Sequence, residues 1–238
     1  ATMLALLEDK KADLGDPVDL EKGVWQVSRR TVYDSERHGR NNVTLKQAFE
    51  LSSNVGMAKM VWSHYSRNPM QYVSHLKKLH LNEYSGIDLV GETRPIVKTP
   101  KSKTWSATTL PWMSFGYEVL VSPLQTLMLY NAVANNGTMM KPYLVNEIKQ
   151  DGITLKNFGP QVVEQAICSE PTLKKLQECL VGVCGEQNGT GYKLFKGSAY
   201  AVAGKTGTAL VANGKRGYAD HIYQSSFAGY FPANDPKY

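Results

Sequence analysis

The sequence predicts a single domain of the α+β class, in which amphipathic helices surround an antiparallel hairpin. Capping boxes followed by apolar stripes at helical spacing recur along the chain. Towards the C-terminal end, two segments of strand character flank a polar turn that contains glycine. The 238 residues are 42% hydrophobic, which is enough to bury a substantial core. Together these observations predict one globular, mostly helical unit.

The first helix signal is the segment Thr44-Leu45-Lys46-Gln47, a capping box. The helix that it opens places Leu45, Ala48 and Phe49 on one face and reaches Ser52 about two turns later.

A second helix is expected to follow directly, with Asn54 as its N-cap and with Val55, Ala58 and Val61 turned inward. A serine and an asparagine at such a junction are usually capping residues and nothing more. From local sequence alone, Ser52 and Asn54 can therefore be capping residues without a catalytic role.

Further helix signals follow along the chain. Asn68 and Pro69 begin a helix whose inner face is Tyr72, Leu76 and Leu79. A long loop is expected between Ser85 and Trp112, where Gly, Pro, Thr and Lys replace any periodic pattern. Two more helices are predicted beyond it: one from the capping box Ser122-Pro123-Leu124-Gln125 to a closing Gly137, and one over Ser169 to Gly185 with Leu173, Leu176, Leu180 and Val183 inward.

The predicted hairpin consists of a strand with Lys205 near its end, a turn at 213–217 and a second strand over 219–232. Gly207 leaves room for a substrate backbone to pair with the strand edge. The hydroxyls of Thr206 and Thr208 and the ammonium of Lys205 can then meet a carboxylate. This pattern selects anionic, peptide-like acyl donors. Taken alone, a Lys-Thr-Gly triplet more often marks an ordinary turn.

Three segments, in this order, resemble the transpeptidase domain of class B penicillin-binding proteins, most closely the division-specific penicillin-binding protein 3 type: LSSNVGMAKM, PWMSFGYEVLVSPLQTLMLYNAVANNGTMMKPYLV and AVAGKTGTA. Ser52-Ser53-Asn54 and Lys205-Thr206-Gly207 match two of the three motifs that this family shares with serine β-lactamases. Glu118 stands where the family often has glycine, which bears on the shape of the local loop. The resemblance implies the penicillin-binding protein transpeptidase or serine β-lactamase-like fold.

The resemblance also implies roles for the matching residues. Ser52 would relay a proton to the leaving group, with electrostatic support from Lys205, and Asn54 would hold the substrate amide. Thr206 and Thr208 would bind the terminal carboxylate, beside Gly207 on the same strand. The backbone N–H of Thr208 would supply half of an oxyanion hole.

The family's Ser-x-x-Lys motif is expected before Ala1, because residues 1–9 resemble the remainder of the helix that it opens. The alternative pair Ser74 and Lys77 is rejected: both would point to solvent, in the wrong order for the family. Residues 1–238 are therefore expected to be a partial transpeptidase domain, truncated at both ends. Such a chain lacks the N-terminal strands, the nucleophile, and the C-terminal strand and helix, keeps an incomplete antiparallel sheet and is inactive alone.

Composition narrows the other possibilities. The net charge of +6 allows nucleic-acid binding in principle, but the basic residues are scattered and a solvated surface is favoured. The three cysteines have no metal-ligand spacing and are interpreted as core residues. The five histidines form no motif, so neither a zinc site nor a Ser-His-Asp triad is indicated. No cofactor is implied.

The resulting hypothesis is a peptidoglycan D,D-transpeptidase that cross-links stem peptides through a serine acyl-enzyme and binds β-lactam antibiotics. By resemblance, it would act with membrane-bound cell-division proteins on the outer face of the cytoplasmic membrane, held by an N-terminal membrane helix outside this chain. The alternatives are a β-lactamase or β-lactam sensor of the same fold, and a non-catalytic interaction module.

Overall fold

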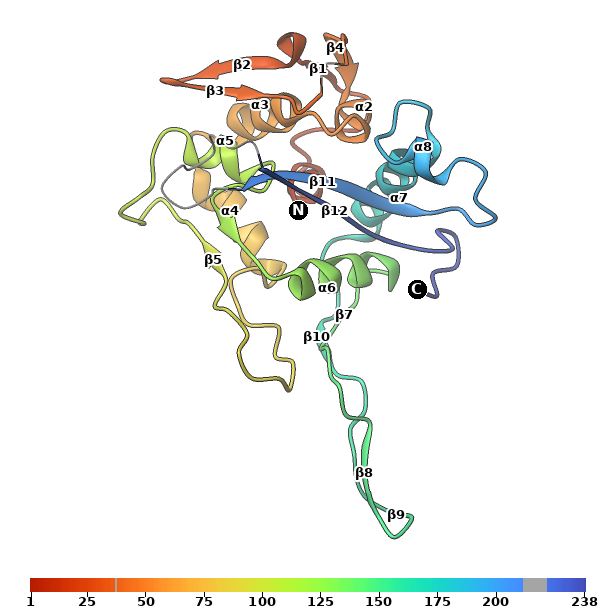
Figure 1. The fold of residues 1–238 in the computed structure, drawn as a ribbon. Helices are drawn as coiled ribbons and strands as arrows, with labels where there is room; N and C mark the ends of the chain where they lie inside the picture. The colour runs from red at the N-terminus through yellow and green to blue at the C-terminus, as the bar shows by residue number, and fades with distance from the viewer. Residues whose placement is uncertain (37, 212–221) are drawn as a thin grey trace.

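A computed structural model of the chain describes residues 1–36, 38–211 and 222–238. Helices and antiparallel strand pairs alternate along it, which confirms the α+β class (Figure 1). The helices are α1 (Thr2–Glu8), η1 (Glu21–Gly23, a 3-10 turn), α2 (Leu45–Glu50), α3 (Asn54–Tyr65), α4 (Pro69–Lys78), α5 (Thr109–Met113), α6 (Pro123–Ala134), α7 (Glu170–Gly185) and α8 (Tyr192–Phe195). The strands are β1 (Pro17–Asp19), β2 (Val24–Val27), β3 (Arg30–Tyr33), β4 (Asn42–Thr44), β5 (Ile96–Val97), β6 (Val119–Leu120), β7 (Met139–Met140), β8 (Glu147–Gln150), β9 (Ile153–Asn157), β10 (Val162–Glu164), β11 (Ala203–Val211) and β12 (Ile222–Tyr230).

The predicted C-terminal hairpin is the pair β11–β12, which is two-stranded and antiparallel within the described residues. Its register runs from Ala203 opposite Tyr230 to Val211 opposite Ile222. Lys205 is therefore the third residue of its strand, and its expected place near the strand end was wrong. The reason is that pairing starts in the small residues before Lys205 and continues well past the triplet. The turn predicted at 213–217 lies outside the described residues.

Helices pack on both sides of this hairpin. α7 lies against β11, while α6 lies against β12, and α1 and α2 pack on α7 (Figure 1). α1 is almost wholly buried. The core that these elements share with α3 and α4 includes the fully buried side chains of Met3, Leu4, Leu6, Leu45, Tyr65, Tyr72 and Leu79. Burial of these large side chains holds the helices around the hairpin.

The predicted capping boxes are both present. The hydroxyls of Thr44 and Ser122 accept hydrogen bonds from the N–H groups three residues on, and the glutamine side chains return the bond. The expected N-cap at Asn54 was one residue off. Ser53 has the extended backbone of an N-cap and its Oγ accepts from the N–H of Gly56 at 2.9 Å, so Asn54 is the first residue of α3.

The other helix predictions agree with the structure. Ser74 and Lys77 are exposed on α4, which confirms that they form no buried catalytic pair. The N–H of Gly137 donates to the carbonyl of Ala132 at 2.7 Å and closes α6. Two further sets of residues are buried as expected: the inward face of α7 (Leu173, Leu176, Leu180 and Val183) and the three unpaired thiols (Cys168, Cys179 and Cys184).

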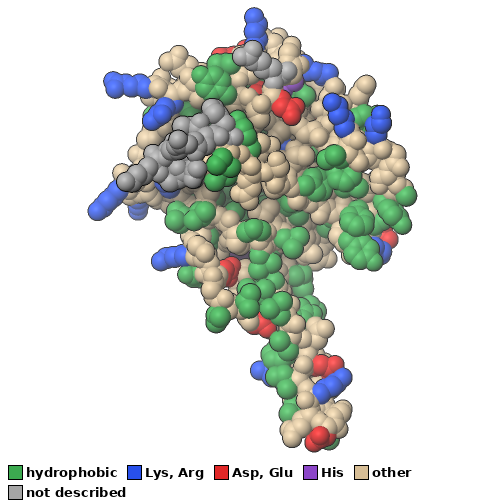
Figure 2. All heavy atoms as spheres, in the orientation of Figure 1, with side chains coloured by type: hydrophobic (Ala, Val, Ile, Leu, Met, Phe, Trp, Pro, Cys, Tyr) green, Lys and Arg blue, Asp and Glu red, His purple; other side chains and the backbone are tan. Residues whose placement is uncertain are grey.

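One projecting element was not anticipated. β7 and β10 pair at its base, and beyond them the hairpin β8–β9 extends away from the body of the molecule (Figure 1). Hydrophobic side chains lie along this projection (Figure 2), where Ile148, Ile153 and Leu155 are exposed.

The segment between Ser85 and Trp112 is mostly irregular, with a few turns, and contains β5 and the start of α5. It is tied to the following segment by an ion pair between Lys98 and Glu118. Glu118 has a φ of 62°, in the left-handed region that favours glycine. The loop keeps a glycine-like shape although a glutamate occupies the position.

Among the described helices, none has the length and apolar character needed to span a bilayer.

Candidate active site

Both predicted motifs line a single cavity of about 760 Å³. All six predicted site residues are among its lining residues: Ser52, Asn54, Lys205, Thr206, Gly207 and Thr208. The first two come from the junction of α2 and α3, and the other four come from β11. The structure thus brings together two motifs separated by about 150 residues of sequence. Ala1 also lines the cavity, at the start of α1.

A direct contact joins the two motifs. The ammonium of Lys205 donates to Ser52 Oγ at 2.7 Å and to the carbonyl of Thr206 at 3.0 Å. The same nitrogen lies 5.8 Å from the centre of the Phe49 ring. Burial lowers the pKa of Lys205 to about 8, because removing the ammonium from water disfavours its charge, while nearby Cys184 acts weakly in the opposite direction. Lys205 is therefore a cation whose proton is held less tightly than that of a surface lysine.

The backbone at Ser52 explains how its hydroxyl reaches this lysine. Ser52 follows the last turn of α2 and has a φ of 56°. Its N–H donates to the carbonyl of Phe49, and the N–H of Ser53 donates to the carbonyl of Ala48. These two bonds form a Schellman motif, in which the left-handed position usually belongs to glycine. A serine in this place indicates that its side chain serves a purpose that offsets the backbone strain.

Asn54 lies beside Ser52 on the cavity wall. Its Nδ2 donates to the carbonyl of Tyr33 at 2.9 Å, which fixes the side-chain amide against the end of β3. One amide oxygen then remains to accept a hydrogen bond from a ligand.

The outer edge of β11 is lined by Thr206 and Thr208. The N–H of Leu210 donates to the hydroxyl of Tyr117 at 3.0 Å, so it faces away from β12. Because backbone groups alternate in direction along a strand, the N–H of Thr208 faces the same way. At Gly207 an added Cβ would lie 2.5 Å from Ser226 Oγ, so the position has little space for a side chain. This edge can receive an extended peptide.

Thr190 is a cavity residue that the sequence analysis missed. Its hydroxyl lies 2.6 Å from that of Thr206, and its N–H donates to the carbonyl of Glu50. It stands between Gly189 and Gly191 in the connection from α7 to α8. The two flanking glycines were its sole sequence signal, and they indicate a tight turn without specifying a partner.

The described residues contain no group of three or more His, Cys, Asp or Glu side chains placed to hold a metal ion. One histidine does join a polar network: His38 Nε2 lies 2.9 Å from Asp34 Oδ2, while Ser53 Oγ donates to the same carboxylate. The carboxylate stands between the serine and the imidazole, so this is a different order from a Ser-His-Asp triad.

Comparison with known families decides the assignment. The family model "Penicillin binding protein transpeptidase domain" matches residues 1–238. The chain belongs to this family. The class B resemblance seen in the motifs is thereby confirmed, and so is the transpeptidase fold.

Individual members of the family support the assignment. Penicillin-binding protein PbpB of Mycolicibacterium smegmatis is 30% identical over 87% of this chain and 32% of the relative. Peptidoglycan D,D-transpeptidase FtsI of Buchnera aphidicola is 29% identical over 89% of this chain and 34% of the relative. The crystal structure of penicillin-binding protein 3 from Mycobacterium tuberculosis complexed with aztreonam superposes with a TM-score of 0.83, at 28% identity, over 99% of this chain and 52% of that structure. The chain spans about a third of the length of these two curated relatives.

Proposed function

We propose that this chain forms the acyl-donor-binding part of a peptidoglycan D,D-transpeptidase, which cross-links stem peptides and is acylated by β-lactams. The observation that carries the proposal is the 2.7 Å contact between Lys205 Nζ and Ser52 Oγ, inside a cavity bordered by the outer edge of β11. The names of its relatives, peptidoglycan D,D-transpeptidase among them, agree with it.

In the proposed reaction, the lysine of the Ser-x-x-Lys motif takes the proton of a serine hydroxyl as that oxygen attacks the carbonyl of the penultimate D-Ala, and the terminal D-Ala leaves as an amine. Ser52 passes a proton to that amine, and the Lys205 ammonium stabilises the relay electrostatically. The N–H of Thr208 donates to the oxyanion. A neighbouring peptide's amine then attacks the acyl-enzyme and releases the serine.

Substrate binding uses the remaining lining residues. The hydroxyls of Thr206 and Thr208 meet the terminal carboxylate, and Gly207 lets the peptide backbone approach the strand. Asn54 holds the substrate amide through its amide oxygen. Thr190, in contact with Thr206, fixes the orientation of that hydroxyl.

The attacking serine is proposed to belong to a Ser-x-x-Lys motif that precedes Ala1. Ala1, Thr2, Met3 and Leu4 all line the cavity, so the start of α1 borders the same cavity as Ser52 and Lys205. On this proposal the 238 residues are a partial domain and do not react with penicillin by themselves. The whole protein is proposed to be anchored on the outer face of the cytoplasmic membrane, with cell-division proteins as partners.

The test is covalent labelling of the full-length protein with a fluorescent penicillin. We expect a long-lived label, and we expect Lys205→Met to slow labelling by about 10²-fold or more, as for loss of a group in proton transfer. Lys174→Met is the matched control, because Lys174 is an exposed lysine whose ammonium pairs with Glu170 on the surface of α7. Absence of label, or rapid release of hydrolysed penicillin, would contradict the proposal.

A further inference from the structure

Asp34, at the end of β3, is a buried carboxylate next to the Ser52-Ser53-Asn54 motif. Its side chain is 3% exposed, and the residue lines the cavity. Nothing in the reaction proposed above uses it. A carboxylate so deeply removed from water needs several hydrogen bonds to offset its desolvation.

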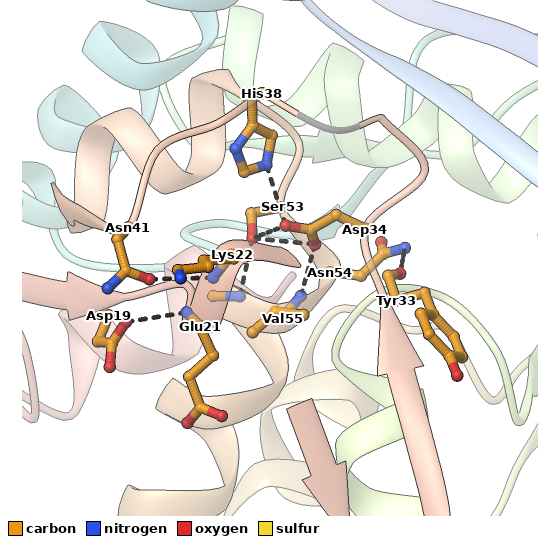
Figure 3. A network of polar contacts seen from close by, with 11 residues as sticks. Asp19, Glu21, Lys22, Tyr33, Asp34, His38, Asn41, Ser53, Asn54 and Val55 are labelled. Atoms are coloured by element: carbon orange, nitrogen blue, oxygen red, sulfur yellow. Dashed lines mark hydrogen bonds and ion pairs between the residues drawn. The ribbon is translucent and has the colours of Figure 1, made fainter. Parts of the chain in front are cut away.

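Those hydrogen bonds all lead to the junction between α2 and α3 or to one histidine (Figure 3). Ser53 Oγ donates to Asp34, 3.0 Å from Oδ1 and 2.9 Å from Oδ2. The N–H of Val55 donates to Oδ1 at 2.9 Å, and His38 Nε2 lies 2.9 Å from Oδ2. The backbone N–H of Asp34 donates to the carbonyl of Gly23 at 3.0 Å, which anchors Asp34 to the residue that precedes β2.

Ser53 is central to this network because it also accepts the N–H of Gly56. Its hydroxyl therefore links the carboxylate to the first turn of α3. Hydrogen bonds to a carboxylate are generally stronger than those between neutral groups. They fix the backbone of Ser53 in its extended N-cap conformation.

A fixed Ser53 constrains the residue before it. Ser52 has a φ of 56°, a conformation that is unfavourable for a non-glycine residue and persists only where the surrounding structure determines it. On one side it is held by the end of α2. On the other side it is held by Ser53, and through Ser53 by Asp34.

We propose that Asp34 is a positioning residue that acts through Ser53 to aim Ser52 Oγ at Lys205 Nζ. The inference rests on the proposed function, since it concerns the geometry of the same site. Within the described part of the chain, the hydrogen bonds of the Asp34 carboxylate reach Ser53, Val55 and His38 and do not include Ser52. Its effect is to keep the Ser52 hydroxyl within hydrogen-bonding distance of the lysine before substrate binds.

The first experiment measures the rate constant of penicillin acylation for full-length Asp34→Asn. The substitution keeps the shape of the side chain but replaces one charged acceptor by a donor. We expect acylation to slow by about 10-fold to 10²-fold, the range for slight misplacement of a reacting group. The penicillin concentration that gives half-saturation should change little. Asp19→Asn is the matched control, because Asp19 Oδ1 also accepts a backbone N–H, that of Glu21 at 2.8 Å, but lies outside the cavity. We expect it to acylate at the wild-type rate.

A double-mutant cycle separates positioning from a general loss of stability. In a Ser52→Ala background there is no hydroxyl to aim, so adding Asp34→Asn should change the acylation rate by less than about twofold. The same loss in both backgrounds would overturn the inference, and so would wild-type acylation by Asp34→Asn. A wild-type protein that takes no label contradicts the proposed function instead.

If Asp34→Asn does not fold, Ser53→Ala tests the same link, because it removes the hydroxyl and leaves the bond from Val55 to Asp34. Ser122→Ala is its control, since Ser122 caps α6 in the same way. Acylation that slows in Ser53→Ala but keeps the wild-type rate in Ser122→Ala supports the inference. Wild-type acylation by a folded Ser53→Ala overturns it.

Discussion

At the scale of single residues, the site depends on a lysine and a serine that are each in an unusual state. The pKa of Lys205 falls to about 8 through burial, and Ser52 occupies a left-handed position that usually belongs to glycine. Each state has a cost, and each serves the 2.7 Å contact between them. The ammonium is charged at neutral pH and close to the pH at which it would lose that charge.

This gives a pH prediction for acylation by penicillin. A lowered pKa means that Lys205 loses its proton near pH 8 and not near 10.5, so the acylation rate should fall as pH rises through about 8. Lys205→Arg keeps a positive charge at all these pH values. The variant should therefore show no fall near pH 8, whatever its rate at neutral pH. Rate constants from pH 6 to pH 10 provide the measurement, and an unchanged alkaline fall in Lys205→Arg would assign the titration to another group.

The sequence was sufficient to pick out the two motifs of the site, but not the hydrogen bonds that surround them. Ser52, Asn54 and Lys205 were found because their types and order match a family pattern. The network around Asp34 was not found, since it joins Asp34 to Ser53 across a separation of 19 residues that leaves no local pattern. The N-cap was assigned to Asn54 instead of Ser53 because both types are good caps and local sequence does not separate adjacent candidates.

At the scale of elements, the contact between α2 and α7 helps to position residues that line the cavity. Glu50, two residues before Ser52, is 3% exposed and lies against Gly182 of α7. Burial raises the pKa of Glu50, with Lys46 partly opposing that shift. The carbonyl of Glu50 accepts the N–H of Thr190, so the contact between α2 and α7 also places the threonine that contacts Thr206.

Gly182 should therefore be intolerant of any side chain. An alanine Cβ would lie 2.0 Å from Glu50 Oε1 and 2.9 Å from Glu50 Cδ, so the buried carboxyl would have to shift from its place 3.7 Å from Lys46 Nζ. We expect Gly182→Ala to lower the free energy of unfolding by about 1–3 kcal/mol, as overpacking does. Gly185→Ala, on the same helix with nothing within 4 Å, should be neutral or stabilising by up to about 1 kcal/mol. Urea unfolding of the two variants measures the difference, and equal stabilities would contradict the contact between α2 and α7 as described.

Helices were easier to predict than strands for a physical reason. An apolar stripe extends over three or more turns in α6 and α7, and a capping box also marks the start of α6, so both helices fall where expected. Strand pairs such as β5–β6 have two residues each, too few to show a period. The hairpin β8–β9 exposes both faces, so it lacks the apolar alternation of a half-buried sheet.

At the scale of the whole molecule, the hairpin β11–β12 lies among helices, and this arrangement belongs to the transpeptidase fold of the family. β12 carries exposed apolar side chains, including Tyr223 and Phe227. A sheet of two strands is marginal alone in water, so α6 and α7 provide most of its support. Local patterns predicted the helices and the hairpin, and resemblance supplied the family's fold. Nothing in the periodicity of the sequence indicates which helices cover which strand.

The central claim is that Ser52 and Lys205 assist a serine that precedes Ala1. Its most direct test is peptide mapping by mass spectrometry of the full-length protein after reaction with penicillin. We expect one penicilloyl adduct on a serine N-terminal to Ala1, in a Ser-x-x-Lys motif, and none on residues 1–238. An adduct on Ser52, Ser53 or any other residue of this chain would contradict it.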